Sequence, residues 1–214
     1  MICNLKKKGR FITIEGIEGA GKSTQIKLIE SFLNSKNIPY IATREPGGTP
    51  LAELIRKLII AQNTEAPTAI TELLLVFSAR AQHLEKKIVP ALEAGTWVVC
   101  DRFTDASYAY QGGGREISLS SIKFLESLVQ GEFKPDLTFF LDLSIINSRK
   151  RVGKRTSSDR IEKEQDSFFE RVRNTYFDRI SESPERYCVV DACLNYELIN
   201  SQIVETISRQ FEIF

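Results

Sequence analysis

The stretch Gly16-Ile-Glu-Gly-Ala-Gly-Lys-Ser-Thr24 decides the fold, because its glycines, lysine and serine have the spacing of a complete phosphate-binding loop. The three glycines permit backbone conformations that a Cβ would penalise, so the N–H groups can point inward toward a phosphate. Lys22 supplies a mobile cation for the β- and γ-phosphates, and the Ser23 hydroxyl is placed to bind a metal ion. The stretch therefore predicts a site for a nucleoside triphosphate with Mg²⁺.

The sequence on either side of this stretch supports that interpretation. Phe11–Glu15 alternates like a strand, and apolar residues recur at helical spacing from Ile26 to Leu33. A strand, a turn and a helix in this order would add the positive end of the helix dipole to the phosphate site. The alternative is a glycine-rich turn with an incidental lysine, which would not require this flanking pattern.

Length and composition limit the class of protein. The 214 residues fit one domain, over 1–214, with a well-buried core. A net charge of +1 argues against a broad electrostatic contact with nucleic acid or an anionic membrane. No apolar run approaches the roughly 18 residues of a membrane-spanning helix. The basic residues before Phe11 do not begin a secretory signal, because Glu15 and the phosphate-binding loop interrupt the apolar stretch.

The cysteines and the single histidine show no metal-binding or redox spacing. Cys3, Cys100, Cys188 and Cys193 form no Cys-x-x-Cys pair, which predicts reduced thiols and a cytoplasmic location. Cys100 and Cys188 lie in apolar runs and are expected in the core. His83 lies in a helical, charged stretch, so we expect a surface or boundary residue rather than a general base.

Strand-like and helix-like segments alternate along the chain, which predicts an α/β fold with a mostly parallel sheet between layers of helices. Short apolar runs predict strands at Phe11–Glu15, Tyr40–Arg44, Trp97–Asp101, Leu137–Asp142 and Tyr187–Asp191. Helical patterns cover the residues near 22–36, 51–61, 68–94, 118–130, 144–152, 163–182 and 196–211. Pro90 is expected to bend or divide the long third helix.

Two segments are unlike ordinary connections. Asp105–Arg115 is rich in glycine and aromatic residues and is predicted to be a functional loop. Arg149–Arg160 is strongly basic, and a solvated helix face or an RNA-binding patch are possible interpretations of it. No aromatic residues interleave with the basic ones, which argues against RNA. Beside a phosphate site, such a segment could instead close over the transferring group, stabilise its charge and exclude water.

Polar residues at further places are candidates for the chemistry. Asp101 ends an apolar run, where a carboxylate can hold Mg²⁺ opposite Ser23 or, alternatively, cap a turn. Arg102 follows it, and the planar fork of an arginine suits a phosphate. Phe77-Ser-Ala-Arg80 places a ring and a guanidinium on one helix face, which suits a planar base. Taken alone, Phe77 would more often be a core residue.

By themselves, these residues predict a nucleotide-dependent phosphotransferase. The alternatives are a kinase for a different small acceptor, a GTPase switch or ATP-driven motor, and a non-catalytic nucleotide sensor. The sequence has no Asn-Lys-x-Asp motif for guanine and no Asp-Glu pair at a strand end, which disfavours a switch and a motor. A sensor would need neither Asp101-Arg102 nor the basic segment.

Together, these segments resemble the thymidylate kinase family over nearly the whole chain. The resemblance rests on Gly16–Thr24, Thr43–Thr49, Phe77–Arg80, Asp101–Phe103, Ser107–Gly113 and Asp159–Glu162. It implies transfer of the γ-phosphate of ATP to dTMP with Mg²⁺, a three-layer P-loop kinase fold with five parallel strands, and a homodimer. It also implies a short mobile lid over about residues 149–160.

The resemblance further implies how dTMP would be bound. Phe77 would stack on thymine, Arg80 would bind its O4, and Ser107 would read the N3 edge. Tyr110 would crowd the sugar 2′ position, and Arg102 would bind the acceptor phosphate. The remaining acceptor residues would be Glu18, Arg44, Glu45 and Gln111.

By the same resemblance, ATP would be bound by the phosphate-binding loop and the basic segment. Its residues would be Gly16, Ile17, Glu18, Gly19, Ala20, Gly21, Lys22, Ser23, Thr24 and Arg149, with Ser23 and Asp101 at Mg²⁺. Ala20 replaces the basic loop residue that part of the family carries, so the chain resembles the bacterial-like style with catalytic arginines in the lid. The catalytic residues would then be Lys22, Arg102, Arg151 and Arg155.

Overall fold

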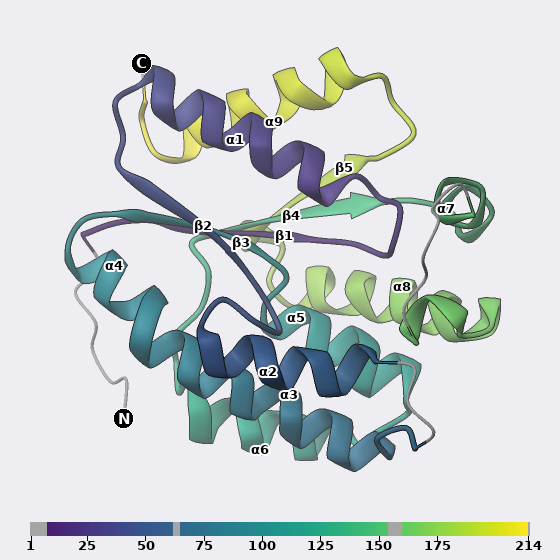
Figure 1. Ribbon diagram of the computed structural model, residues 1–214. Coiled ribbons are helices and arrows are strands. Elements are labelled where there is room, and N and C mark those ends of the chain that lie inside the picture. Colours follow the sequence, from purple (N-terminus) through teal and green to yellow (C-terminus); the bar gives the residue numbers. More distant parts are fainter. Residues whose placement is uncertain (1–7, 62–64, 154–159, 214) are drawn as a thin grey trace.

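Five parallel strands form one sheet with helices on both faces (Figure 1). The computed structural model describes residues 8–61, 65–153 and 160–213. The sheet order is β2-β3-β1-β4-β5, and the strands are β1 (Phe11–Glu15), β2 (Tyr40–Arg44), β3 (Trp97–Asp101), β4 (Leu137–Asp142) and β5 (Tyr187–Asp191). Each strand begins and ends at the residues predicted from its apolar run, and the predicted α/β fold is confirmed.

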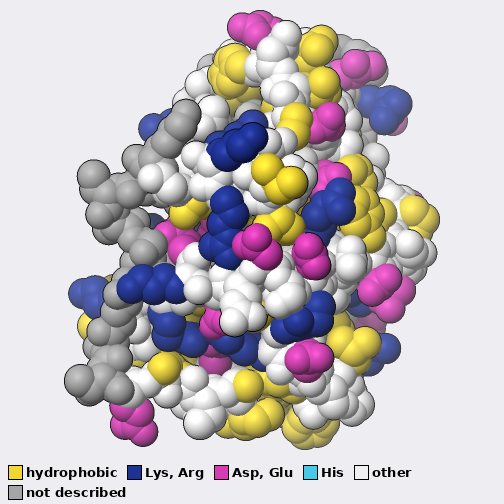
Figure 2. Space-filling model, turned by 90° about the vertical axis from the view of Figure 1, so that its right-hand side faces the viewer, with side chains coloured by type: hydrophobic (Ala, Val, Ile, Leu, Met, Phe, Trp, Pro, Cys, Tyr) yellow, Lys and Arg dark blue, Asp and Glu magenta, His cyan; other side chains and the backbone are white. Residues whose placement is uncertain are grey.

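The register of the sheet brings the polar strand ends together. β1 lies between β3 and β4, with Ile14 opposite Asp101 and Glu15 opposite Phe140. All four strand pairings are parallel, so the carboxyl ends share one edge, where α/β sheets bind their ligands. Figure 2 looks onto this side of the molecule and shows Lys and Arg side chains around its middle.

Helices α1 (Lys22–Ser35) and α9 (Tyr196–Gln210) cover one face of the sheet (Figure 1). The opposite face is covered by α2 (Pro50–Ile60), α3 (Ala69–His83), α4 (Val89–Glu93), α5 (Thr104–Ser107), α6 (Leu119–Val129) and α8 (Asp166–Glu182). α7 (Ile145–Val152) lies beyond the carboxyl ends of the strands, and the short turns η3 (Ile161–Lys163) and η4 (Pro184–Arg186) flank α8. The three layers of the predicted fold are therefore present.

The starts of the helices follow from local sequence. Thr49 caps α2 by accepting from the Ala52 N–H at 3.3 Å, and Pro50 is its first helical residue. α1 is different, because it follows the left-handed Gly21 and has no side-chain cap. Its first N–H groups therefore stay available to an anion in the loop.

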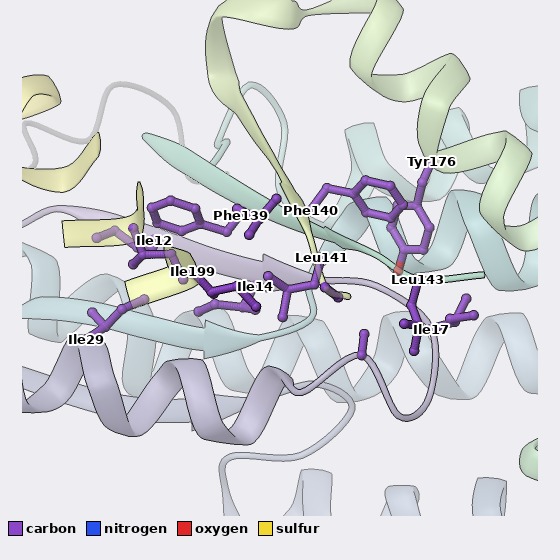
Figure 3. Packing of buried hydrophobic residues seen from close by; sticks show 14 of the residues in the cluster. Ile12, Ile14, Ile17, Ile29, Phe139, Phe140, Leu141, Leu143, Tyr176 and Ile199 are labelled. Carbon is purple, nitrogen blue, oxygen red and sulfur yellow. The ribbon is translucent and has the colours of Figure 1, made fainter. Parts of the chain in front are cut away.

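The main core packs the sheet against helices α1 and α9 on one face and against α8 on the other. Ile12 and Ile14 of β1 belong to the same buried cluster as Ile29 and Ile199 (Figure 3). Neighbouring strand residues point to opposite faces, so Phe11 belongs to a second cluster on the other side of the sheet. Burying a side chain of this size contributes about 1.5–3 kcal/mol. β1 is thus anchored on both faces, which fixes the start of the phosphate-binding loop.

The segment Asp105–Arg115 is helical, so the prediction of a loop is wrong. It comprises α5 and a π-helix, η2 (Tyr108–Gly114). Its glycines permit a close approach to α8, because a Cβ on Gly113 would lie 2.2 Å from Thr175 Oγ1. The glycine content reflects a tight helix contact, which the local pattern does not distinguish from a flexible loop.

His83 is fully buried, so the prediction of a surface or boundary position is wrong. Its Nδ1 lies 3.1 Å from Glu45 Oε1, and its Nε2 lies 2.7 Å from the Thr43 hydroxyl. Thr43 lies in β2 and Glu45 follows it, and both meet α3 only through the tertiary fold. His83 therefore supports the chain around Glu45.

The long third helix is divided as predicted. A π-helical turn, η1 (Leu84–Ile88), separates α3 from α4, and Pro90 lies in the first turn of α4. The chain stays helical from α3 through η1 into α4, and Pro90 has no N–H to donate to the preceding turn. The division therefore precedes Pro90 directly.

The described thiols are free, but Cys188 packs only at the edge of the core instead of inside it. Cys100 is buried, Cys188 half-buried and Cys193 exposed, and all three are free, while Cys3 lies outside the described residues. In the part of the chain that the structure describes, no helix combines the length and the apolar character needed to cross a bilayer.

Candidate active site

The phosphate-binding loop has the backbone that its glycines predict. Its three glycines have φ angles of 136°, 78° and 94°, which L side chains rarely adopt. Lys22 Nζ donates to the carbonyl oxygens of Gly16 (3.0 Å) and Ile17 (3.1 Å), so it lies across the loop. Burial, together with Arg102, lowers the pKa of Lys22 from 10.5 to about 8. A bound phosphate would favour the charged form of this lysine.

Glu18, Arg102 and Tyr110 form a polar cluster beside the loop. Arg102 Nη2 donates to Glu18 Oε1 at 2.7 Å, and the Tyr110 hydroxyl lies 2.9 Å from each Glu18 carboxylate oxygen. The Arg102 guanidinium carbon lies 4.6 Å from the centre of the Tyr110 ring. The cluster therefore offers a fixed guanidinium for a phosphate, next to groups that can bond to a sugar hydroxyl.

This cluster belongs to a pocket built from several segments, which we call the acceptor pocket. It brings together most residues predicted for the acceptor, namely Glu18, Glu45, Arg80, Arg102, Ser107, Tyr110 and Gln111. Its other lining residues are Pro46, Arg56, Ile59, Ile60, Val76, Phe103, Ala106 and Ile161. Apolar walls with a few charged groups suit a planar base joined to a phosphate.

Arg80 is fixed in this pocket, and one nitrogen of its guanidinium has no hydrogen-bond partner among the described residues. Its Nε donates to Glu45 Oε2 at 2.7 Å, and its Nη2 donates to the Ser107 hydroxyl at 2.9 Å and the Phe103 carbonyl at 3.1 Å. The guanidinium carbon lies 4.7 Å and 5.1 Å from the ring centres of Phe77 and Phe103. Nη1 is buried and has no hydrogen-bond partner among the described residues. A donor oriented in this way suits a base carbonyl.

A second groove, which we call the metal groove, contains both residues predicted for Mg²⁺. Ser23 and Asp101 line it, and Asp101 Oδ1 is buried without a hydrogen-bond partner among the described residues. Oxygen ligands in small number suit Mg²⁺, which usually keeps several waters and binds phosphates. No group of three or more His, Cys, Asp or Glu within 8–61, 65–153 and 160–213 could hold a metal by itself. The pair therefore fits a metal shared with a bound phosphate.

Comparison with known proteins decides the family. The model of the thymidylate kinase family matches residues 14–203. The chain belongs to the thymidylate kinase family. A thymidylate kinase of Teredinibacter turnerae is 55% identical over 184 residues, covering 86% of this chain and 90% of that protein. One of Nitrosospira multiformis is 49% identical, covering 94% of this chain and 98% of its own.

A solved structure supports the same family. The crystal structure of thymidylate kinase from Ehrlichia chaffeensis is 32% identical in sequence, with a TM-score of 0.74, covering 94% of this chain and 98% of that one. The resemblance inferred from the motifs is thereby confirmed, and this member of the thymidylate kinase family is a phosphotransferase with the P-loop kinase fold.

The structure does not bring Phe77 together with the other residues predicted for the acceptor base. The Phe77 ring is buried in a cluster that includes Tyr108 and Ile122, and it is absent from the described residues that line the acceptor pocket. Val76 lines the pocket instead, because it lies four residues before Arg80 and shares its helix face. In this thymidylate kinase family member Val76 gives the acceptor pocket an aliphatic wall, and the Phe77 ring packs against Arg80.

Arg44 also lies outside the acceptor pocket. It pairs with Glu53 at 2.8 Å, its side chain is 52% exposed, and it lines the metal groove together with Ser23. The reason is the strand alternation: Glu45 turns into the acceptor pocket, so the residue before it points the other way. The structure therefore does not bring Arg44 together with the other residues predicted for the acceptor.

Arg56 is a candidate binding residue that the sequence analysis missed. It lines the acceptor pocket, and its Nη1 donates to the Pro46 carbonyl at 2.9 Å. Burial, together with the nearby arginines, lowers the pKa of Arg56, which shows how much positive charge gathers here. Ile59 and Ile60 follow it on the same face of α2, so a lone arginine on an apolar helix face was the available signal.

Gln111 is tied to the far end of the basic segment through Glu72. Its Nε2 donates to Glu72 Oε1 at 2.9 Å, and the buried Glu72 also accepts hydrogen bonds from Arg115 and Arg160. Ile161, which follows Arg160 in the chain, lines the acceptor pocket. Glu72 thus connects two walls of this pocket. No sequence pattern on its helix predicts this role.

Arg149 is bound to the chain that follows the basic segment rather than to the phosphate-binding loop. Its Nε donates to Asp166 Oδ1 at 2.7 Å, and its Nη1 donates to the Glu162 carbonyl at 2.8 Å. The structure therefore does not bring Arg149 together with the other residues predicted for ATP.

Arg151, in contrast, contacts the phosphate-binding loop. It donates to the Gly19 carbonyl at 3.2 Å and to the Ala192 carbonyl at 2.9 Å, bridging the loop and the segment after β5. Its charge therefore lies next to the loop. Arg155 lies outside the described residues.

Proposed function

We propose that the chain transfers the γ-phosphate of ATP to dTMP, giving ADP and dTDP, and so contributes to dTTP synthesis for DNA replication. The observation that carries this proposal is the unpaired, buried Nη1 of Arg80 in a pocket beside a phosphate-binding loop. Membership of the thymidylate kinase family supports it. Residues 1–214 would act as one kinase domain, and free thiols at three described cysteines agree with a cytoplasmic location.

The acceptor would lie in the acceptor pocket with its base toward Arg80. Nη1 would donate to O4 of thymine, while Ser107, which already accepts from Arg80, would lie at the N3 edge. Arg102 would bind the acceptor phosphate, because Glu18 holds its guanidinium in place and the planar donors of a guanidinium match a phosphate. Tyr110, bonded to the same carboxylate, would crowd a ribose 2′-hydroxyl and disfavour ribonucleotides.

The donor phosphates would bind to the loop at the start of α1. Lys22, which contacts only loop carbonyls and neighbouring charges among the described residues, would turn to the β- and γ-phosphates. Arg151 would add positive charge from the Gly19 side, and Arg155 is proposed for the same role on the basic segment. Catalysis would then consist of positioning and charge neutralisation, with direct transfer to the acceptor phosphate.

Mg²⁺ is the metal we propose for the metal groove. Ser23 and Asp101 would hold it, directly or through water, because the unpaired Asp101 carboxylate oxygen needs a positive partner. When bound, the ion would neutralise part of the phosphate charge.

A homodimer is the assembly we propose. Leucines and a phenylalanine on α2, α3 and α6, three neighbouring helices of one layer, are at least half exposed: Leu51, Leu54, Leu58, Leu74, Phe124 and Leu128 (Figure 1). An apolar face of this kind suits a second copy of the chain. Leu54→Glu and Phe124→Glu are expected to yield a monomer in sedimentation analysis. Leu198→Glu on α9 is the control, and an unchanged mass in the first two variants would refute the interface.

The experiment that tests the function is an ADP-release assay with ATP and Mg²⁺ against a panel of nucleoside monophosphates. We expect turnover with dTMP, weaker turnover with dUMP, and little with UMP, CMP, AMP or GMP. Preference for a ribonucleotide would keep the phosphotransferase but refute the acceptor. ATP binding without turnover of any acceptor would favour a nucleotide sensor.

A further inference from the structure

Glu15, the last residue of β1, is a fully buried carboxyl group directly before the phosphate-binding loop. In the sheet, Ile14 lies opposite Asp101, so Glu15 reaches the chain just beyond β3, where Arg102 lies. We propose that Glu15 is a positioning residue for Arg102, holding its backbone through Phe103 and its guanidinium through Tyr176. This inference rests on the proposed function of Arg102 in binding the acceptor phosphate.

The first link acts on the backbone. Arg102 has a φ angle of 68°, a left-handed conformation that costs free energy in a non-glycine residue. The turn is held on both sides, because the Arg102 N–H donates to the Ile14 carbonyl at 3.0 Å and the Phe103 N–H donates to Glu15 Oε1 at 2.7 Å. Without the carboxylate, the buried Phe103 N–H would lose its acceptor. Glu15 therefore stabilises the conformation that points Arg102 at the site.

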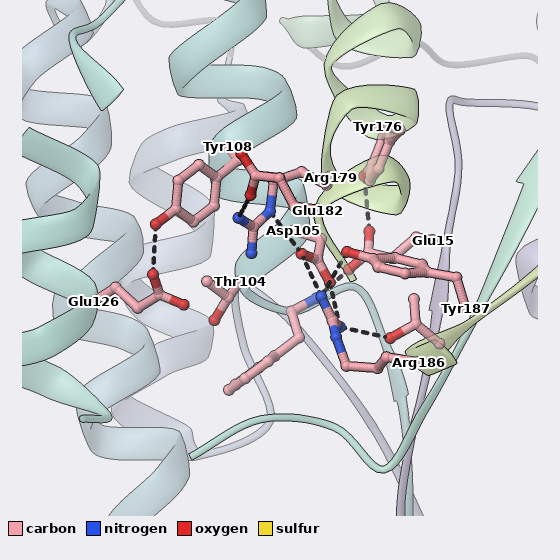
Figure 4. A network of polar contacts seen from close by, with 12 residues as sticks. Glu15, Thr104, Asp105, Tyr108, Glu126, Tyr176, Arg179, Glu182, Arg186 and Tyr187 are labelled. Atoms are coloured by element: carbon pink, nitrogen blue, oxygen red, sulfur yellow. Dashed lines mark hydrogen bonds and ion pairs between the residues drawn. The ribbon is translucent and has the colours of Figure 1, made fainter. Parts of the chain in front are cut away.

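The second link acts on the side chain. The fully buried hydroxyl of Tyr176, on α8, donates to Glu15 Oε2 at 2.7 Å (Figure 4). The same hydroxyl accepts from Arg102 Nη1 at 3.4 Å. Glu15 thus orients the Tyr176 oxygen so that its lone pair faces the guanidinium. Nη2 is held separately by Glu18, which leaves the fork fixed at two points.

The buried carboxyl group of Glu15 lowers the stability of the folded protein. Burial and the Asp105 carboxylate raise the pKa of Glu15 from 4.5 to about 8, although Arg102 and the hydrogen bonds from Tyr176 and Phe103 lower it. The folded chain therefore binds this proton more tightly than the unfolded chain, and Glu15 costs stability as the pH rises from about 4.5 to about 8. A residue retained at such a cost is more typical of a functional site than of a purely structural contact.

The test combines Glu15→Gln, Tyr176→Phe and Arg102→Ala in a double-mutant cycle. Loss of one hydrogen bond to an ionised group corresponds to about a tenfold change, so at pH 9, where Glu15 is ionised, Glu15→Gln and Tyr176→Phe should each lower kcat/KM for dTMP about tenfold. KM for ATP should stay within about twofold in both variants. In the Arg102→Ala background, Glu15→Gln should lower activity by less than about twofold further, because its target is gone.

Tyr108→Phe is the matched control, because it removes a hydroxyl bonded to Glu126 on the other side of η2. Thermal unfolding at pH 9 should show Glu15→Gln to be at least as stable as the wild type. Should that variant fail to fold, Tyr176→Phe alone decides, and wild-type activity in it overturns the proposal. The proposal would also be overturned if the loss of kcat/KM in the double variant Glu15→Gln, Arg102→Ala equalled the product of the losses in the two single variants. Wild-type activity of Arg102→Ala would instead refute the proposed function itself.

Discussion

Glu45 accepts a hydrogen bond from Arg80 Nε at 2.7 Å, and both side chains are almost fully buried. Removing two charges from water is costly, and only close geometry with further hydrogen bonds offsets that cost. Here Ser107 and the Phe103 carbonyl supply those bonds to Arg80, and His83 supplies one to Glu45. The pair therefore holds Nη1 in a fixed direction, which is what a base-reading arginine requires.

Arg80→Lys should remove this reading of the base. A lysine is a point charge and cannot serve Glu45, Ser107 and a base carbonyl together. We expect kcat/KM for dTMP to fall about 100-fold, with KM for ATP nearly unchanged. Steady-state kinetics with each substrate varied in turn measures this. Arg171→Lys, whose arginine bonds to carbonyls of η2 outside the acceptor pocket, is the control. Equal losses in both variants would contradict the assignment.

Glu45→Gln should make the protein less sensitive to acid. Burial raises the pKa of Glu45, but Arg80 and His83 outweigh it, so the folded-state pKa lies below 4.5. The charged group therefore stabilises the fold above its unfolded pKa, and this contribution disappears as the pH falls through the folded value. Removing one partner of a buried pair costs about 3–5 kcal/mol at neutral pH. Urea unfolding at pH 7 and pH 3 should show a smaller difference in Glu45→Gln than in the wild type.

Val76→Ala and Phe77→Leu should separate binding from packing. Val76 lines the acceptor pocket, so its truncation should raise KM for dTMP about tenfold. Phe77 packs in the core, so Phe77→Leu should lower the free energy of unfolding by about 1–3 kcal/mol and change KM for dTMP less. Kinetics and denaturant unfolding on both variants measure the two effects. A larger KM effect in Phe77→Leu would restore the stacking role to that ring.

Nucleotide binding should take up a proton through Lys22. At pH 8 this lysine is about half protonated, and a bound triphosphate restores its charge, so ATP binding should take up about half a proton. The affinity for ATP should accordingly fall as the pH rises above about 8. Calorimetry in two buffers of different ionisation enthalpy measures the uptake. Lys22→Met should abolish it and Lys27→Met should not; uptake that persists without Lys22 would refute the assignment.

Asp101→Asn should weaken the binding of Mg²⁺. An amide keeps the shape but loses the charge, so the Mg²⁺ concentration for half-maximal activity should rise about tenfold or more. Asp142→Asn is a matched control, because Asp142 also ends a strand but pairs with Arg173 at 2.6 Å. Metal titrations of both variants decide the point. The same Mg²⁺ dependence in Asp101→Asn and the wild type would exclude Asp101 as a ligand.

The five strands and the phosphate-binding loop could be predicted from the order of the residues alone. Strand limits followed from short apolar runs, and the loop followed from glycines whose left-handed conformations the structure contains. Both depend on residues adjacent in the chain, whose steric and hydrophobic preferences act locally. Asp101 and Arg102 could be placed at the ligand-binding edge for the same reason, because parallel strands share that edge.

Which side chains enter the acceptor pocket depends on how the helices and strands pack together. Val76 and Phe77 are neighbours in sequence, but their directions differ because α3 packs with one face toward the pocket and another toward Ile122. Glu15 meets Tyr176 across 161 positions of the chain. Such pairs depend on how helices and strands pack against one another, which a local pattern does not encode. The sequence therefore determined the ligand-binding edge and its loop, and packing determined which residues can read the acceptor.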